Sequence, residues 1–104
     1  MNKLRYAARK VDANQAVIVD TLRKLGASVI SLHDAGSGIP DLLVGFRGVT
    51  KLIEVKNPDT KGKLNERQLH WHAVWRGDPV AAVYTVDDVI ALFPALPGTI
   101  HDLF

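Results

Sequence analysis

At 104 residues, the chain is long enough for one domain with a sizeable hydrophobic core, which we expect to cover residues 1–104, and too short for a second domain. Its composition, 47% apolar and 23% charged, is typical of a globular protein, and the lack of cysteine excludes disulfides, thiolate zinc sites and cysteine nucleophiles. A net charge of +2 permits a nucleic-acid partner, while the lack of a long apolar run excludes a membrane span and a signal peptide and favours a cytoplasmic location.

The hydrophobic pattern predicts the element order helix, three strands, helix, strand, helix. The predicted ranges are a helix over 12–25, strands over 27–33, 41–46 and 49–56, a helix from 66 to 77, a strand over 80–86 and a helix within 85–93. Asp12 with Gln15 resembles a capping box for the first helix, and Gly26 stands where its C-terminal cap belongs. The helical connection before the last strand suits parallel pairing, so we expect an α/β fold with a mixed central sheet flanked by helices.

The strands over 41–46 and 49–56 are separated by a turn short enough to pair them as a hairpin. Residues i and i+2 of a strand point to the same face, so Glu54 and Lys56 share a face and Asp41 lies on the neighbouring strand. Two acids and a lysine should therefore meet on one patch of the sheet. Burying charged groups among apolar neighbours costs free energy, which a divalent cation held by the two carboxylates would offset.

This set of groups has the chemistry that phosphodiester hydrolysis needs. Magnesium prefers oxygen ligands and usually takes one or two protein carboxylates, so Asp41 and Glu54 supply the minimum, with the carbonyl of Val55 as a candidate third ligand. Mn²⁺ is expected to substitute for Mg²⁺. Lys56 would orient or deprotonate the attacking water, or stabilise charge developing on phosphorus. Two adjacent carboxylates favour the charged form of the lysine, and hence the stabilising role.

Pro40-Asp41 followed by Glu54-Val55-Lys56 resembles the signature of the PD-(D/E)XK nuclease superfamily. Together with the segments 38–45 and 64–68 and with Trp71, these residues are similar to small stand-alone VRR-NUC (virus-type replication-repair nuclease) domains. The resemblance covers nearly the whole chain, and the predicted order of elements is also the αβββαβ core order of that superfamily.

The resemblance implies roles for individual residues. Asp41 and Glu54 would hold the metal, Lys56 would be the catalytic lysine, and Gln68 would contact the site or the scissile phosphate. It further implies a DNA endonuclease that acts as a homodimer on structured DNA such as four-way (Holliday) junctions, and a phage or prophage origin. Such nucleases often have a first-helix glutamate facing the metal, where this chain has Gln15. Either Gln15 binds a metal-held water, or the first-helix role is lost.

Several of these residues also have simpler explanations. Gln68 stands three residues after Asn65, where a capping box for the second helix would explain it without catalysis. The cationic group of Lys61, Lys63 and Arg67 is either an ordinary solvated loop or a set of phosphate contacts.

Aromatic residues and histidines in the second helix also have two interpretations. Trp71 and Trp75 are four residues apart and should stack on one face, where we favour a core position over a dimer face or contacts with unpaired bases. His70 and His72 are two apart on a helix and point in different directions, so a shared metal ion is not expected.

Two functions from other classes compete with the nuclease. The first is a nucleic-acid-binding module that keeps the nuclease fold without hydrolysis, which the missing first-helix glutamate motivates. The second is a structural or assembly subunit whose contacts are made by the tryptophans and by the C-terminal pair Leu103 and Phe104.

Overall fold

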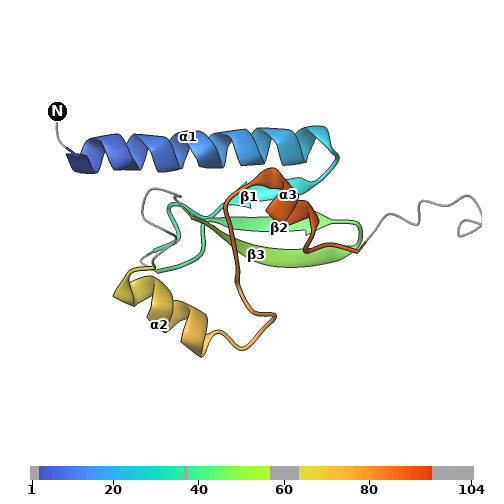
Figure 1. Cartoon of the computed structure of the whole chain (residues 1–104). Helices are drawn as coiled ribbons and strands as arrows, with labels where there is room; N and C mark the ends of the chain where they lie inside the picture. The colour runs from blue at the N-terminus through green and yellow to red at the C-terminus, as the bar shows by residue number, and fades with distance from the viewer. Residues whose placement is uncertain (1–2, 37, 57–63, 95–104) are drawn as a thin grey trace, which may run out of the picture.

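The computed structural model describes residues 3–36, 38–56 and 64–94 (Figure 1). Their elements, in chain order, are α1 (Lys3–Lys24), β1 (Ser28–Ser31), β2 (Leu42–Phe46), β3 (Val49–Val55), α2 (Glu66–Val74), β4 (Ala81–Val83) and α3 (Val86–Ile90). The predicted order of helices and strands is confirmed.

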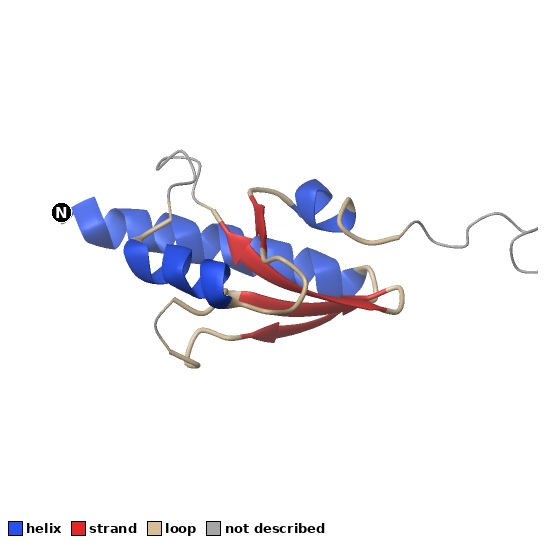
Figure 2. Ribbon diagram, turned by 90° about the horizontal axis from the view of Figure 1, so that it is seen from below, coloured by secondary structure: helices blue, strands red, loops and turns tan. Residues whose placement is uncertain are grey.

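The four strands form one mixed sheet in the order β1-β2-β3-β4 (Figure 2). The pairs β1–β2 and β2–β3 are antiparallel, whereas β3 and β4, the strands on either side of α2, pair in parallel. A parallel pair needs a long crossover connection, which α2 and its flanking loops provide. The predicted α/β fold with a mixed sheet is therefore confirmed.

A two-residue turn sets the register of the β2–β3 hairpin. Arg47 and Gly48 both have positive φ angles, 52° and 79°, as the tight turns that match the twist of paired strands require. Leu42 consequently pairs with Ile53. Because the strands run antiparallel, this register places Asp41, just before β2, next to Glu54 near the end of β3.

The helices lie on opposite faces of the sheet, with α1 and α3 on one face and α2 on the other (Figure 1). The hydrophobic core lies on the α1 face, and its members with 1% exposure or less are Ile18, Leu22, Leu42, Val44, Ile53, Val83 and Val89. Since side chains alternate along a strand, the inward direction of Ile53 and Val55 sends Glu54 to the α2 face. The alternation in β3 thus puts the buried carboxylate on the face opposite to the main core.

Two expectations about the first part of the chain are wrong. The first helix begins at Lys3, so Asp12 and Gln15 lie inside α1 and form no cap; the residues before position 12 are rich in alanine, arginine and lysine, which favour helix. The alternation of Val29 with Ile30 and Leu32 predicts burial on both faces of β1, but Ile30 is 57% exposed on this edge strand. The C-terminal cap is as expected, with Gly26 at φ 97°. In the described ranges, no helix combines the length and apolar character that crossing a bilayer requires.

Trp71 and Trp75 stack as their spacing predicts, with ring centroids 4.8 Å apart and planes 17° apart. Their assignment to the core is wrong, because Trp75 is 43% exposed and no residue of α2 is fully buried. The short α2 covers only part of its sheet face and leaves an apolar pocket of about 430 Å³, lined in part by both tryptophans, Leu43 and Leu52.

The loop before β2 packs closely on α2 at Gly38. A Cβ atom at Gly38, which has φ 81°, would lie 2.5 Å from the carbonyl oxygen of Arg67. Gly48 has nearly the same φ, 79°, but no atom within 4 Å of its Cβ direction. Only the absence of a side chain at Gly38 lets the segment leading to Asp41 lie this close to the helix.

This difference predicts that two matched substitutions have unequal effects on stability. Gly48→Ala should lower the free energy of unfolding by about 1 kcal/mol, the cost of a positive φ for alanine. Gly38→Ala should lower it by about 3 kcal/mol or more, because a backbone carbonyl must also move. Urea denaturation of both variants measures the difference; equal losses would show that the loop does not pack on α2 as described.

Candidate active site

The predicted site residues come from three segments that the fold brings to one end of the sheet. Asp41 precedes β2, Glu54 and Lys56 lie at the end of β3, and Gln68 lies in the first turn of α2. The hairpin register aligns the first two, and the crossover through α2 places Gln68 over the sheet face to which Glu54 points.

The carboxylate of Asp41 is oriented by the backbone of β3. Its Oδ2 accepts a hydrogen bond from the N–H of Val55 at 2.7 Å. The next N–H, that of Lys56, instead donates to the carbonyl of Val83 on β4, also at 2.7 Å. In an extended strand the N–H and C=O of one residue point toward the same neighbour, so the Val55 carbonyl faces the Asp41 side of β3.

Glu54 is the buried charged side chain of the described residues, with 2% exposure. Its Oε1 accepts a hydrogen bond from Nε2 of Gln68, whereas its Oε2 is buried without a hydrogen-bond partner in the described structure. Burial, and then the negative charge of Asp41, raise the pKa of Glu54 to about 8, although a hydrogen bond from the Asp41 backbone acts in the opposite direction. The Asp41 carboxylate therefore lies close enough to Glu54 to disfavour the ionisation of Glu54.

Gln68 caps α2 and contacts Glu54 through different atoms. Its backbone N–H donates to Oδ1 of Asn65 at 2.9 Å, and its Oε1 accepts from the N–H of Asn65 at 2.9 Å, which completes the capping box of α2. The remaining amide nitrogen, Nε2, donates to Glu54. Because the cap fixes the side chain, Gln68 presents a preoriented donor to the buried carboxylate.

Lys56 interacts with two aromatic side chains, those of Tyr84 and His72, that the sequence did not predict as part of the site. Its Nζ is 5.8 Å from the centroid of the Tyr84 ring, and its positive charge helps to lower the pKa of His72. Tyr84 is connected to α1, because Nδ2 of Asn14 donates to its carbonyl oxygen at 3.2 Å. One sequence signal for His72 was available: it follows Gln68 by four residues and so shares its helix face.

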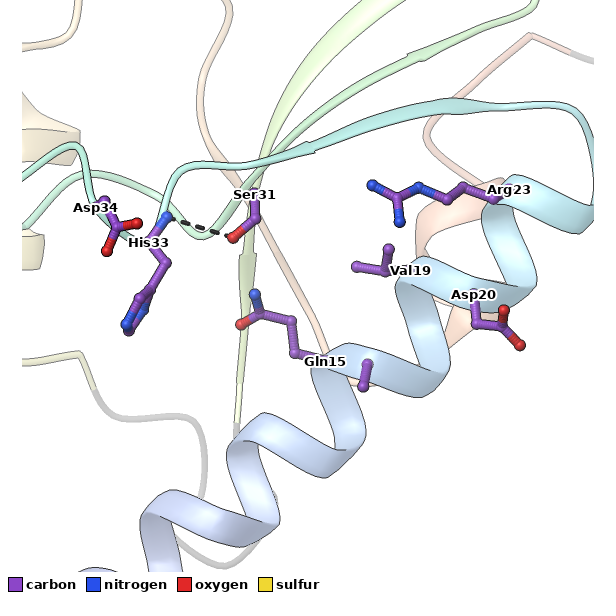
Figure 3. A pocket seen from close by; sticks show the side chains of 8 residues that line it. Gln15, Val19, Asp20, Arg23, Ser31, His33 and Asp34 are labelled. Carbon is purple, nitrogen blue, oxygen red and sulfur yellow. Dashed lines mark hydrogen bonds between the residues drawn. The ribbon is translucent and has the colours of Figure 1, made fainter.

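The structure places Gln15 on the α1 face of the sheet. Gln15 lies on α1 and lines a pocket of about 580 Å³ with Ser31 and His33 at the end of β1 (Figure 3). Glu54 instead bonds to α2, on the opposite face of the sheet. The role of Gln15 at the site, through a metal-held water, and the alternative that the first-helix role is lost both stay predictions.

The predicted phosphate contacts are placed only in part. Lys61 and Lys63 lie outside the described residues. Arg67 is exposed in the first turn of α2, directly before Gln68. Its position puts one cation of this group beside the carboxylate site.

Comparison with known proteins supports one family. No family model matches the sequence, and no curated protein matches it. Among solved structures, a chain described as "VRR_NUC domain" shares 34% sequence identity with this chain and superposes with a TM-score of 0.60, covering 80% of this chain and 92% of that one. The chain belongs to the VRR-NUC family. The resemblance seen in the sequence is thus confirmed, and the chain is a nuclease domain of the PD-(D/E)XK type.

The donor set of this VRR-NUC domain fits a magnesium ion. A buried carboxylate oxygen of Glu54 has no partner, and Asp41 lies near enough to raise the pKa of Glu54. Within the described ranges, no group of three or more Asp, Glu, His or Cys side chains is placed so that it could hold a metal ion. Two carboxylates suit magnesium, since it retains several waters rather than needing a full set of protein ligands.

The buried carboxylate predicts how the stability of this VRR-NUC domain depends on pH without metal. Because the pKa of Glu54 rises from 4.5 to about 8 on folding, the folded state binds more protons between these pH values. The free energy of unfolding should therefore fall as pH rises from 5 to 8, by at most about 4 kcal/mol. Glu54→Gln should remove this fall and be more stable than the wild type at pH 8.

Urea denaturation in EDTA at pH 5.5 and pH 8 measures both free energies. Glu66→Gln, at an exposed position of α2, is the matched control and should keep the wild-type dependence. A Glu54→Gln variant with an unchanged pH dependence would contradict the assignment of the high pKa to Glu54.

Proposed function

We propose that this nuclease domain is a Mg²⁺-dependent DNA endonuclease that hydrolyses phosphodiester bonds. The observation that carries the proposal is the pairing of a buried, incompletely satisfied Glu54 with Asp41, followed on the same strand by Lys56. A cation stabilises two neighbouring carboxylates that repel each other, and a lysine next to them suits a negatively charged substrate.

Asp41 and Glu54 would hold the ion, with the carbonyl of Val55 as a third ligand. The direction of the Val55 backbone supports this choice, since its N–H already bonds to Asp41 and its carbonyl faces the same side. When bound, Mg²⁺ would neutralise a phosphate oxygen and lower the pKa of a coordinated water. Mn²⁺ would substitute, because it accepts the same oxygen ligands in similar geometry.

The protein's own groups orient this chemistry. The ammonium of Lys56 would stabilise negative charge that develops on the phosphoryl oxygens, and would orient the attacking water. Gln68 would hold one oxygen of Glu54 and so leave the other directed to the ion. Asp41 would keep its orientation through the Val55 N–H during turnover. These fixed partners reduce the reorganisation that the transition state requires.

DNA would reach the site past the N-terminal turn of α2. Arg67, which is exposed, would contact backbone phosphates, because cations favour polyanionic substrates; Lys61 and Lys63, which precede α2 in the sequence, would contribute further phosphate contacts. Such contacts position the DNA without reading its sequence.

We further propose that the domain acts as a homodimer on branched DNA such as four-way junctions. One chain offers one candidate site, so symmetric cutting of two strands needs two copies. Exposed apolar side chains on or near the α2 face, Ile30 at 57% and Trp75 at 43%, support association through this region.

Cleavage assays on linear, flapped and four-way DNA test the proposed reaction. With Mg²⁺ or Mn²⁺, the wild type should cut, and Asp41→Asn and Lys56→Met should each lower the rate by about 100-fold or more, since each removes a group acting in the transition state. Asp20→Asn, at an exposed carboxylate paired with Lys24, should cut like the wild type.

Binding of the same DNA in Ca²⁺ separates catalysis from affinity. Retained binding by Asp41→Asn, with lost cutting, is the expected result. A wild type that binds DNA but cuts none of the substrates with either metal would instead support the non-catalytic binding module.

Sedimentation velocity tests the dimer. The wild type should sediment at twice the 11.4 kDa chain mass, and Ile30→Lys should shift it toward the monomer because a charge would enter the apolar contact. Val17→Lys, at a 60% exposed position on α1, is the matched control and should remain dimeric. A wild type that stays monomeric at high micromolar concentration, with and without DNA, would overturn this part of the proposal.

A further inference from the structure

His72 lies one helical turn after Gln68 in α2, and the two residues therefore share a helix face. That face is turned toward the candidate active site, since Gln68 donates a hydrogen bond to Glu54 from it. The Nε2 atom of His72 is buried and has no hydrogen-bond partner in the described structure. A buried polar atom without a hydrogen bond costs free energy, so we expect this nitrogen to have a hydrogen-bond partner on that face.

Lys56 shares the face of β3 with Glu54, the face to which Gln68 donates from α2, and its ammonium acts on His72. Desolvation lowers the pKa of His72, and the positive charge of Lys56 lowers it further, so the imidazole is neutral. A neutral imidazole has one nitrogen that accepts hydrogen bonds, while an ammonium has three donors and no acceptor. The two groups are thus chemically complementary.

We propose that His72 is a positioning residue for Lys56, with its Nε2 accepting a hydrogen bond from one water that the lysine ammonium also contacts, since the two groups make no direct hydrogen bond in the described structure. This inference rests on the proposed nuclease function, in which Lys56 acts on the phosphate. The bond would satisfy the buried nitrogen and fix the end of a flexible side chain.

The surroundings of Lys56 support this arrangement. A lysine side chain has high rotamer entropy, so a single ring 5.8 Å away, that of Tyr84, leaves its end poorly fixed. Tyr84 is itself anchored, because its carbonyl accepts from Asn14 of α1 and its N–H donates to Oδ2 of Asp88 of α3 at 2.8 Å. With His72 as a second partner from α2, Lys56 would be held between elements that cover the two faces of the sheet.

Nuclear magnetic resonance of the metal-free, ¹⁵N-labelled protein tests the bond without any need for activity. We expect Nε2 of His72 to be the unprotonated acceptor, with a ¹⁵N shift that changes in Lys56→Met. Lys51 also lies on β3, where its ammonium pairs with Asp78. The control variant Lys51→Met should leave the shift unchanged. A protonated Nε2, or a shift that Lys56→Met does not alter, would overturn the inference.

Kinetics of His72 variants test the consequence for catalysis. His72→Leu should lower kcat by about tenfold with little change in KM, whereas His72→Gln, which restores an acceptor near the position of Nε2, should stay within about threefold of the wild type. His70→Leu, at an exposed position on the same helix, should cut normally. Equal losses in the Leu and Gln variants would indicate packing alone and contradict the proposal. Lack of cutting by the wild type would refute the nuclease function, while the NMR result would still decide whether the bond exists.

Discussion

The structure depends on one unfavourable interaction, the burial of the Glu54 carboxylate next to Asp41. Desolvation and like charge raise the pKa of Glu54 to about 8, so the metal-free fold favours a protonated side chain at this position. A hydrophobic residue would pack there at lower cost. Glu54 nevertheless has an unpartnered carboxylate oxygen, and the cation that we propose at this site would convert the cost of burial into affinity.

Each surrounding element contributes to holding this pair. The tight turn of the β2–β3 hairpin sets the register, and a backbone N–H of β3 orients Asp41. The side-chain amide of Gln68 both completes the helix cap of α2 and donates to Glu54, so the cap also orients Gln68 toward Glu54. Close packing of Gly38 on Arg67 joins the loop before Asp41 to the same helix. The contacts that stabilise the fold are thus also the contacts that fix the geometry of the candidate site.

Features with a local cause could be predicted from the sequence. The turn between β2 and β3, the cap of α2 at Asn65 and the parallel crossover all follow from residue type and spacing within short segments. Features decided by packing between distant segments could not. The surface position of Trp75 and the exposure of Ile30 depend on how much of the sheet α2 covers, and the place of Gln15 depends on the face that α1 covers. Local residue spacing does not determine which face of the sheet a helix covers or how much of it.

A crystal structure determined with Mg²⁺ tests the central claim most directly. The account predicts one ion bound by oxygens of both Asp41 and Glu54 at about 2.0 to 2.1 Å, with waters completing its coordination and Gln68 still donating to Glu54. An ordered site in saturating Mg²⁺ at pH 8 that holds no ion between these carboxylates would contradict it.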